Sequence, residues 1–286
     1  MDVLQLIANG MMAGGVLAVP AIGLAAMYSV LRFPNFAIAS HATAGAFAGW
    51  IANASLGLPV LPSLIVALLA GGAIGLLTDE FVLRPFRRAG FITTAIGSLA
   101  LTIGLENVVR LVFGNEMRGY DLPLARDVVL AGIHIGPQQL QNVMVSVVVM
   151  ALVFGFLSFT RMGKAMRAVA DNPPLADIKG IDARMVARIV SFMGMGLAGL
   201  GGMLIGLDSS IDPLTGFRVM LPIFAAAVVG GLGSIPGAVA GALVVGVAEE
   251  LSLLALPPSY KSTVAFLAII LILAVRPRGI FGREAY

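Results

Sequence analysis

The chain has 286 residues, of which 59% are hydrophobic and only 12% charged, whereas a soluble domain carries about 25% charged residues. This composition excludes a water-soluble protein and indicates one domain, residues 1–286, embedded in a lipid bilayer. The formal net charge of +3 comes from basic residues at helix ends, so we expect no nucleic-acid partner, and the absence of cysteine excludes disulfides and cysteine-based metal sites.

About eight apolar segments are long enough, or nearly so, to cross the roughly 30 Å hydrocarbon core of a membrane. The first is too long for the apolar part of a signal peptide, so we interpret it as a retained transmembrane helix. The sequence therefore predicts an all-α, polytopic transmembrane helical bundle, in which some segments are broken or re-entrant. The segments lie at about 6–31, 36–53, 61–83, 91–113, 140–159, 186–207, 219–251 with a break, and 260–275.

Two of these segments contain residues that interrupt a helix. Pro34 and Asn35 precede an Ala- and Gly-rich run, and the stretch Gly230–Pro236 follows the apolar residues 219–230. The latter twelve residues reach only about 18 Å and cannot cross alone. Paired breaks are typical of a transport pathway, although glycines also serve close helix packing. The candidate pathway residues are Asn35, Ser40, His41, Thr43, Gly231, Gly233, Ser234 and Pro236.

Ionisable side chains inside apolar segments are costly and therefore mark candidate functional groups. Glu106 and Arg110 are spaced i, i+4 with the acid first, which predicts a local ion pair. His41 could line the pathway, but a hydrogen-bonded core histidine is the more frequent outcome. The sequence has no catalytic motif and no phosphate-binding loop, so we expect no catalytic residue, cofactor or metal site. Nucleotide-driven transport would require a second chain.

The polar stretch 160–185 carries the clearest local signals. Its residues 163–171 predict a short amphipathic helix, with Met166 and Val169 on the apolar face, that ends before two prolines. Gly180 is suited to end a second short helix, and Asp182 is suited to cap the membrane helix that follows. A loop that only fixed the topology would not require two capped short helices. We therefore expect a coupling loop, in which the apolar face of the first short helix enters a groove of an ATPase. The candidate coupling residues are Gly163, Lys164, Met166, Arg167, Val169, Asp171, Gly180 and Asp182.

Basic residues are distributed unequally between the two predicted sides of the bundle. Thirteen of the eighteen Lys and Arg residues lie on the side of the loop 160–185 and the C-terminus, and five lie on the side of the loop 114–139. Because basic residues concentrate on the cytoplasmic side, the first side is predicted to be cytoplasmic and the second periplasmic. The N-terminus then faces the periplasm if the segment 36–53 crosses.

Three motifs carry a resemblance to a known family: Arg161–Asp171 (RMGKAMRAVAD), Val229–Ala238 (VGGLGSIPGA) and Arg276–Gly282 (RPRGIFG). With them the chain resembles, over nearly its whole length, the LivH/LivM-type permeases of branched-chain amino-acid ABC transporters. Pro34–Ala37 (PNFA) is a weaker match, since the family usually continues with His-Gly. The chain also has Asn-Pro-Pro at 172–174, where the family tends to have acidic residues.

The resemblance implies a transport subunit rather than an enzyme, located in the bacterial inner membrane, that forms the translocation pathway of an ABC importer. It implies three kinds of partner: a second permease, homologous or identical, two cytoplasmic ABC ATPases, and a periplasmic solute-binding protein. The departures from the motifs leave the solute open among branched-chain amino acids, urea, short amides and other small solutes. An ion-coupled secondary transporter is the main alternative; it would need buried acids, which are sparse here, and no coupling loop.

Overall fold

The computed structural model describes residues 3–122, 128–130, 133–276 and 279–281. Nearly all regular structure in these residues is helical, which confirms the all-α, polytopic bundle expected from the sequence. The described strands are β1 (Val128–Leu130) and β2 (Ile133–Ile135), which pair antiparallel between α5 and α6 and were not predicted.

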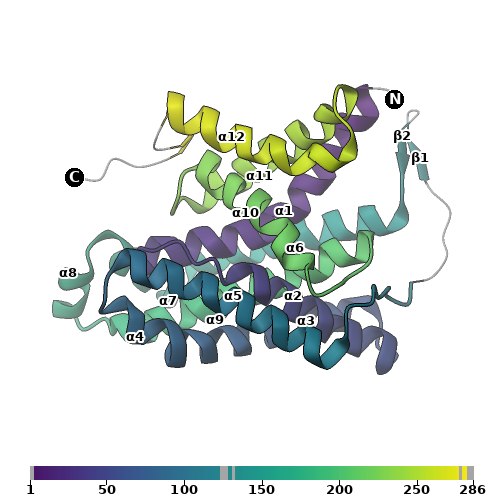
Figure 1. Ribbon diagram of the computed structural model, residues 1–286. Helices are drawn as coiled ribbons and strands as arrows, with labels where there is room; N and C mark the ends of the chain where they lie inside the picture. The colour runs from purple at the N-terminus through teal and green to yellow at the C-terminus, as the bar shows by residue number, and fades with distance from the viewer. Residues whose placement is uncertain (1–2, 123–127, 131–132, 277–278, 282–286) are drawn as a thin grey trace.

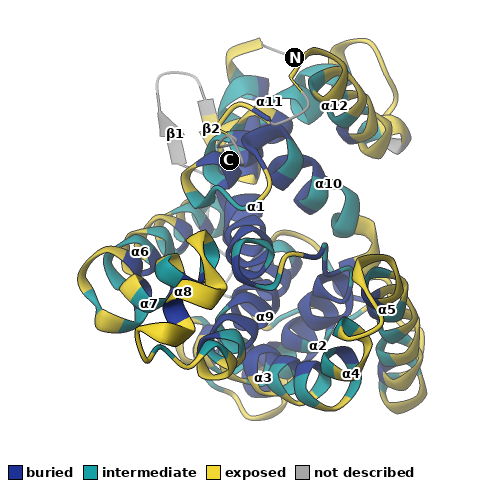
Figure 2. Cartoon of the chain, turned by 90° about the vertical axis from the view of Figure 1, so that its left-hand side faces the viewer, coloured by how far each residue is buried: buried dark blue, intermediate teal, exposed yellow. Residues whose placement is uncertain are grey.

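Two long helices, α1 (Val3–Leu31) and α9 (Ala183–Asp208), form the centre of the bundle and are mostly buried (Figure 2). They approach closely because glycines face each other: a Cβ atom on Gly23 would lie 2.5 Å from the carbonyl oxygen of Gly194. Around them pack α2 (Ile38–Trp50), α3 (Val60–Thr78), α5 (Phe91–Phe113), α6 (Pro137–Phe159), α10 (Thr215–Gly230), α11 (Ile235–Leu251) and α12 (Lys261–Val275). Short helices α4 (Arg84–Arg87), α7 (Arg161–Asp171) and α8 (Pro173–Ile178), π-helical turns at Ile51–Ser55 and Asp79–Leu83, and 3-10 turns at Ser252–Leu254 and Pro258–Tyr260 complete the described helical segments.

Six helical stretches among the described residues are long and apolar enough to cross a membrane. The helices α10 and α12 are apolar but shorter, with 16 and 15 residues. The expected number of about eight segments is therefore approximate: the predicted segment 36–53 is not among these helices, whereas 219–251 supplies two of them. The outer helices expose large apolar side chains, such as Leu111 on α5 and Leu152 on α6, as a lipid-facing surface requires. The chain is therefore a multi-pass membrane protein.

The two ends of the bundle carry different elements (Figure 1). The helices α4, α7 and α8 lie at one end, and the β1–β2 hairpin and the start of α1 lie at the other. We call these the basic end and the hairpin end. The basic end gathers the described residues of the group of thirteen, whereas Arg278 and Arg283 of that group, and Arg126 of the group of five, lie outside the described residues. Which end faces the cytoplasm stays a prediction.

The first break lies inside the bundle. Helix α1 ends at Leu31, and Arg32 adopts a φ of 60°, a left-handed conformation that usually favours glycine. The chain then runs without regular helix to α2. On the way, the Phe36 ring stacks on Phe224 of α10, with 4.6 Å between the ring centroids. The irregular backbone is thus surrounded by protein, the condition under which such backbone is tolerated at membrane depth.

The second break proves to be a reversal of the chain. Helix α10 ends at Gly230, and Gly231 and Gly233 have φ values of 106° and 87° before α11 begins at Ile235. Facing glycines on α10 and α11 then let the two helices pack side by side in opposite directions. The interpretation of 219–251 as one interrupted segment is therefore wrong: it is a helical hairpin, because a tight glycine turn breaks a helix whether the chain continues or reverses.

Candidate functional site

Three candidate pathway residues of the first break contact the backbone of one residue, Ala37. Asn35 Oδ1 accepts a hydrogen bond from the Ala37 N–H at 3.1 Å, and the Ser40 hydroxyl donates to the Ala37 carbonyl at 2.9 Å. His41 Nδ1 lies 2.6 Å from that carbonyl, and its Nε2 lies 3.0 Å from the Thr78 hydroxyl. Because a carbonyl only accepts, Nδ1 carries the proton and Nε2 accepts. His41 is fully buried and is a hydrogen-bonded core histidine in this structure.

Thr43, the fourth residue of this group, joins α2 to the start of α10. Its hydroxyl oxygen accepts a hydrogen bond from the Gly216 N–H at 2.9 Å. A side chain at Gly216 would overlap the carbonyl of Ala39, so a glycine is needed for this approach. All four polar residues have partners within the chain and fix the shape of the broken segment; a contact with solute stays a prediction.

A stripe of hydroxyl residues on α5 holds the same break from the other side. Thr94, Ser98 and Thr102 are buried and spaced by four residues, so they share one face of the helix. The Phe36 N–H donates to the Ser98 hydroxyl at 3.0 Å, and the Thr102 hydroxyl donates to the Phe36 carbonyl at 2.9 Å. Sequence reasoning missed these residues, although their i, i+4 spacing in an apolar helix was a usable signal.

The candidate residues of the second break lie apart from this cluster. Gly231, Gly233 and Ser234 form the turn at the basic end, where the Ser234 hydroxyl accepts from the N–H of Gly237 at 3.2 Å, and Pro236 occupies the first turn of α11. A Cβ atom on Gly233 would lie 3.5–3.7 Å from the last turn of α1. The structure therefore places the two breaks at either side of the end of α1, without bringing their polar side chains into one cavity.

The expected coupling loop is compact and capped. The Thr160 hydroxyl accepts from the N–H of Gly163 at 3.0 Å, which starts α7 two residues earlier than expected. Asn172 Oδ1 accepts from Leu175 N–H at 3.1 Å and starts α8. As predicted, Gly180 adopts a left-handed φ of 80°, and Asp182 caps α9 by accepting from two backbone N–H groups. The loop is an ordered element and not a flexible linker.

The apolar face of α7 is covered by this chain itself. Met166 and Val169 are each only 3% exposed, because α7 packs against α1, α6 and α9. Gly163 is also buried, and a side chain there would overlap the backbone of Leu157. The expectation that this face enters a groove of an ATPase is therefore wrong. An amphipathic pattern shows that one face is covered but does not show by what.

Other parts of the loop remain at the surface. Lys164, Arg167 and Asp171 are exposed on α7. On α8, Leu175 and Ile178 are 52% and 81% exposed and form an apolar patch that sequence reasoning did not single out. We call these two residues the α8 patch.

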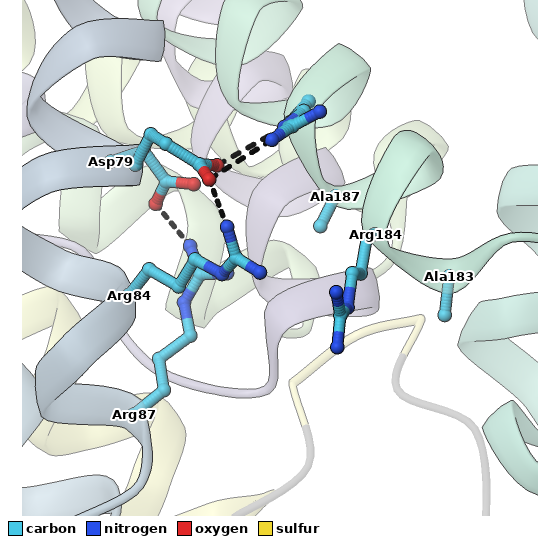
Figure 3. Close-up of a pocket in the computed structure, with 8 residues that line it drawn as sticks. Asp79, Arg84, Arg87, Ala183, Arg184 and Ala187 are labelled. Atoms are coloured by element: carbon cyan, nitrogen blue, oxygen red, sulfur yellow. Dashed lines mark hydrogen bonds and ion pairs between the residues drawn. The ribbon is translucent and has the colours of Figure 1, made fainter.

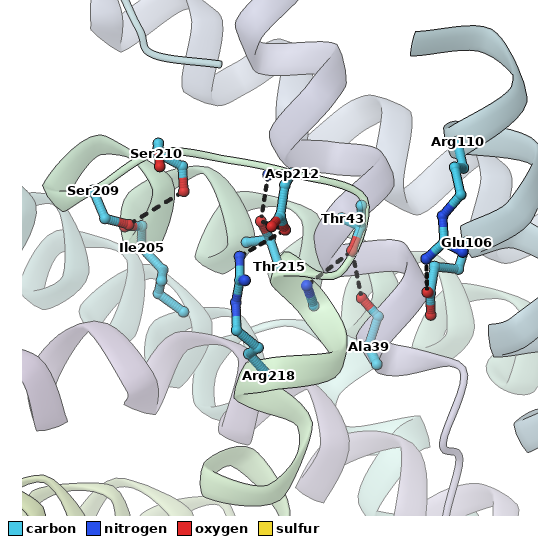
Figure 4. A network of polar contacts seen from close by, with 11 residues as sticks. Ala39, Thr43, Glu106, Arg110, Ile205, Ser209, Ser210, Asp212, Thr215 and Arg218 are labelled. Atoms are coloured by element: carbon cyan, nitrogen blue, oxygen red, sulfur yellow. Dashed lines mark hydrogen bonds and ion pairs between the residues drawn. The ribbon is translucent and has the colours of Figure 1, made fainter. Parts of the chain in front are cut away.

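Ion pairs tie the start of α9 to the end of α3 at the basic end (Figure 3). Glu80 pairs with Arg84 and Arg188, and Asp79 pairs with Arg87. At the hairpin end, Glu106 pairs with Arg110 at 2.8 Å, as predicted, and Asp212 pairs with Arg218 at 2.6 Å (Figure 4). Among the described residues no group of three or more His, Cys, Asp or Glu side chains is placed to hold a metal ion.

Comparisons with known proteins agree along almost the entire chain. A family model described as "Branched-chain amino acid transport system / permease component" matches residues 6–273. The high-affinity branched-chain amino acid transport system permease protein BraD of Pseudomonas aeruginosa is 31% identical, over 98% of this chain and 96% of its own length. The corresponding permease protein LivH of Salmonella typhimurium is 32% identical over the same shares. A chain in the solved structure of PsaBC from Streptococcus pneumoniae in complex with Fab has a similar fold, with a TM-score of 0.52 at 14% identity over 97% of this chain and 94% of that chain.

Proposed function

The chain belongs to the family of permease components of branched-chain amino acid transport systems, and from this premise we propose that it forms the translocation pathway for branched-chain or related amino acids in an ABC importer of a bacterial inner membrane. It is a transport subunit and not an enzyme. An ATPase and a solute-binding protein are the partners that such a permease needs. In the assembly proposed here, a second permease, homologous or identical, completes the pathway, two ATPases bind from the cytoplasm, and the binding protein delivers solute from the periplasm.

The observation that carries this proposal is the ordered loop of α7 and α8 at the basic end. A docking element has to be stiff enough to transmit a displacement, and this loop is capped at each helix and packed on α1, α6 and α9. It presents two kinds of surface to a partner. The α8 patch offers apolar area, and the exposed Lys164 and Arg167 offer charge that can orient an acidic partner surface. Nucleotide-driven closure of the ATPases would act on the bundle through this loop.

The two breaks border the pathway in this proposal. Residues 32–37 lie between α5 and α10, and the turn 231–234 lies against the last turn of α1. Both are places where the backbone is irregular, and at the first of them its polar groups are held by the neighbouring helix α5. Asn35, Ser40 and His41 then act by fixing the arrangement of the first break seen in this structure.

Transport in reconstituted vesicles tests the proposal. Vesicles that contain the permease pair and its ATPases should accumulate labelled leucine only with ATP and the binding protein, and an ATPase variant unable to hydrolyse ATP serves as the control. Unlabelled isoleucine and valine should compete, whereas urea and acetamide should not. Leucine uptake that a proton or sodium gradient drives without any ATPase would refute the importer and support the secondary transporter. Competition by urea alone would refute only the solute class.

A further inference from the structure

A cavity of about 210 Å³ opens at the basic end between the end of α3 and the start of α9 (Figure 3). Its charged lining consists of four arginines and two acids, so by this count it holds two uncompensated positive charges (four minus two). Two small residues, Ala183 and Ala187, leave the space open on the side of α9. The charged residues are Asp79, Glu80, Arg84, Arg87, Arg184 and Arg188.

The ion pairs inside the cavity do not use all of its guanidinium donors. Arg188 makes two hydrogen bonds to Glu80, at 3.0 and 3.1 Å, and Arg84 pairs with the same carboxylate. Arg87 pairs with Asp79, but its Nε atom is buried without a partner. Arg184 makes no ion pair with any other described residue, and Figure 3 places its side chain on the cavity's α9 side. The cavity can therefore accept an anion without first losing its internal pairs.

The depth of the cavity matches the headgroup layer of a membrane. Arg84 follows Val60, the first residue of α3, by 24 positions along one helical stretch, or about 36 Å at 1.5 Å per residue. This exceeds the roughly 30 Å hydrocarbon core. Arg184 and Arg188 lie in the first turns of α9, which begins at the same end. The arginines thus lie at the level of lipid phosphates.

An apolar surface continues from the cavity towards the middle of the membrane. Leu77 and Phe81 are spaced by four residues on the outer side of the same helical stretch and are 56% and 74% exposed. A phospholipid would contact both surfaces, because its headgroup can bind in the cavity and its acyl chains can cover the exposed Leu77 and Phe81. A free phosphate ion or an acidic peptide would leave these two apolar side chains uncovered.

We propose that this cavity binds the headgroup phosphate of an anionic phospholipid, with the acyl chains lying along Leu77 and Phe81. Guanidinium groups pair with phosphate oxygens through paired N–H donors, and basic pockets between transmembrane helices bind anionic headgroups. The bound lipid would bridge α3 and α9, the helix that directly follows the coupling loop. The proposal does not depend on which solute is carried.

Lipid binding to the full chain in a neutral detergent tests this site. Native mass spectrometry with phosphatidylglycerol and phosphatidylcholine should show at least tenfold tighter binding of phosphatidylglycerol. Arg184→Gln should weaken phosphatidylglycerol binding about tenfold, and it should fold because Arg184 is exposed and has no ion pair to lose. The matched control is Arg88→Gln, which removes an exposed charge at the same end but outside the cavity, and should change binding less than twofold. Equal binding of the two lipids, or equal effects of the two variants, would overturn the proposal.

A second comparison separates the lipid from other anions. Inorganic phosphate at millimolar concentration should not displace phosphatidylglycerol, and Phe81→Ser should weaken lipid binding several-fold while Arg88→Gln does not. Full displacement by inorganic phosphate, or unchanged lipid binding in Phe81→Ser, would show that the cavity is a site for a soluble anion and would overturn the lipid assignment.

Discussion

Replacing Ile178 with aspartate tests whether the α8 patch docks on the ATPase. Ile178 is 81% exposed, and substitutions at such positions change the free energy of unfolding by no more than about 0.5 kcal/mol. If an interface covers the side chain, the loss of its burial costs about 1.5–3 kcal/mol of binding free energy. Each 1.4 kcal/mol is a factor of ten in Kd, so the Kd for the ATPase should rise about 10- to 100-fold.

Two measurements on purified protein decide this prediction: the Kd of the ATPase for the permease in lipid nanodiscs, and the melting temperature of the permease alone. Ile178→Asp should raise the Kd and leave the melting temperature unchanged. The contrasting variant is Met166→Ala, because Met166 is buried inside this chain. It should cost about 2–5 kcal/mol of folding stability and lower the melting temperature, while the folded fraction binds ATPase normally. A wild-type Kd for Ile178→Asp would refute docking through α8.

Three further predictions concern the hairpin, the topology and the first break. Gly230→Ala should lower the melting temperature and abolish uptake because its Cβ would overlap a backbone carbonyl of α11, at a cost of about 1–3 kcal/mol, whereas Gly155→Ala meets open space and should do neither. In this cysteine-free chain, a single cysteine at the exposed Met117 should react with a membrane-impermeant maleimide in intact cells and one at Lys179 should not; the reverse pattern would invert the topology. Ser98→Ala should cost about 1–3 kcal/mol in thermal unfolding, since it leaves a part-buried backbone N–H of the first break without an acceptor, and an unchanged melting temperature would contradict this account.

Composition and local signals predicted most of the helices, because each is encoded within a short stretch of sequence. Long apolar runs gave the membrane helices, the caps at Gly180 and Asp182 gave the ends of the coupling loop, and the i, i+4 spacing gave the pair of Glu106 and Arg110. Each of these features is contained in one contiguous stretch of the chain. The helix α7 follows the same rule, apart from a start two residues earlier than expected.

The features that were wrong or missed depend on residues far apart in the chain. The reversal after Gly230 depends on the packing of α11 against α10, and a glycine turn alone does not encode its direction. The cover over the apolar face of α7 comes from α1 and α9 as well as from the preceding α6, so the amphipathic pattern was assigned to the wrong partner. The role of the hydroxyl residues on α5 depends on Phe36, which lies far away in the sequence and whose backbone N–H and carbonyl are hydrogen-bonded by Ser98 and Thr102. Long-range contacts, and not local propensity, decide such cases.

The contacts of α7 determine where a displacement of the coupling loop would act. The Arg32 guanidinium donates to the carbonyl of Ala170 in the last turn of α7, and Arg32 is also the left-handed residue at which α1 ends and the first break begins. Met166, one turn earlier, is packed into the bundle, so α7 cannot move independently of it.

A force applied to the α8 patch would therefore reach the first break through one hydrogen bond and a short stretch of backbone. Because Asp182 caps α9, a displacement of the loop would also reach this helix. The ion pair between Arg188 and Glu80 joins the start of α9 to the end of α3. In the proposed importer, a displaced loop would thus act on both central helices, α1 and α9, and on the irregular backbone between α5 and α10.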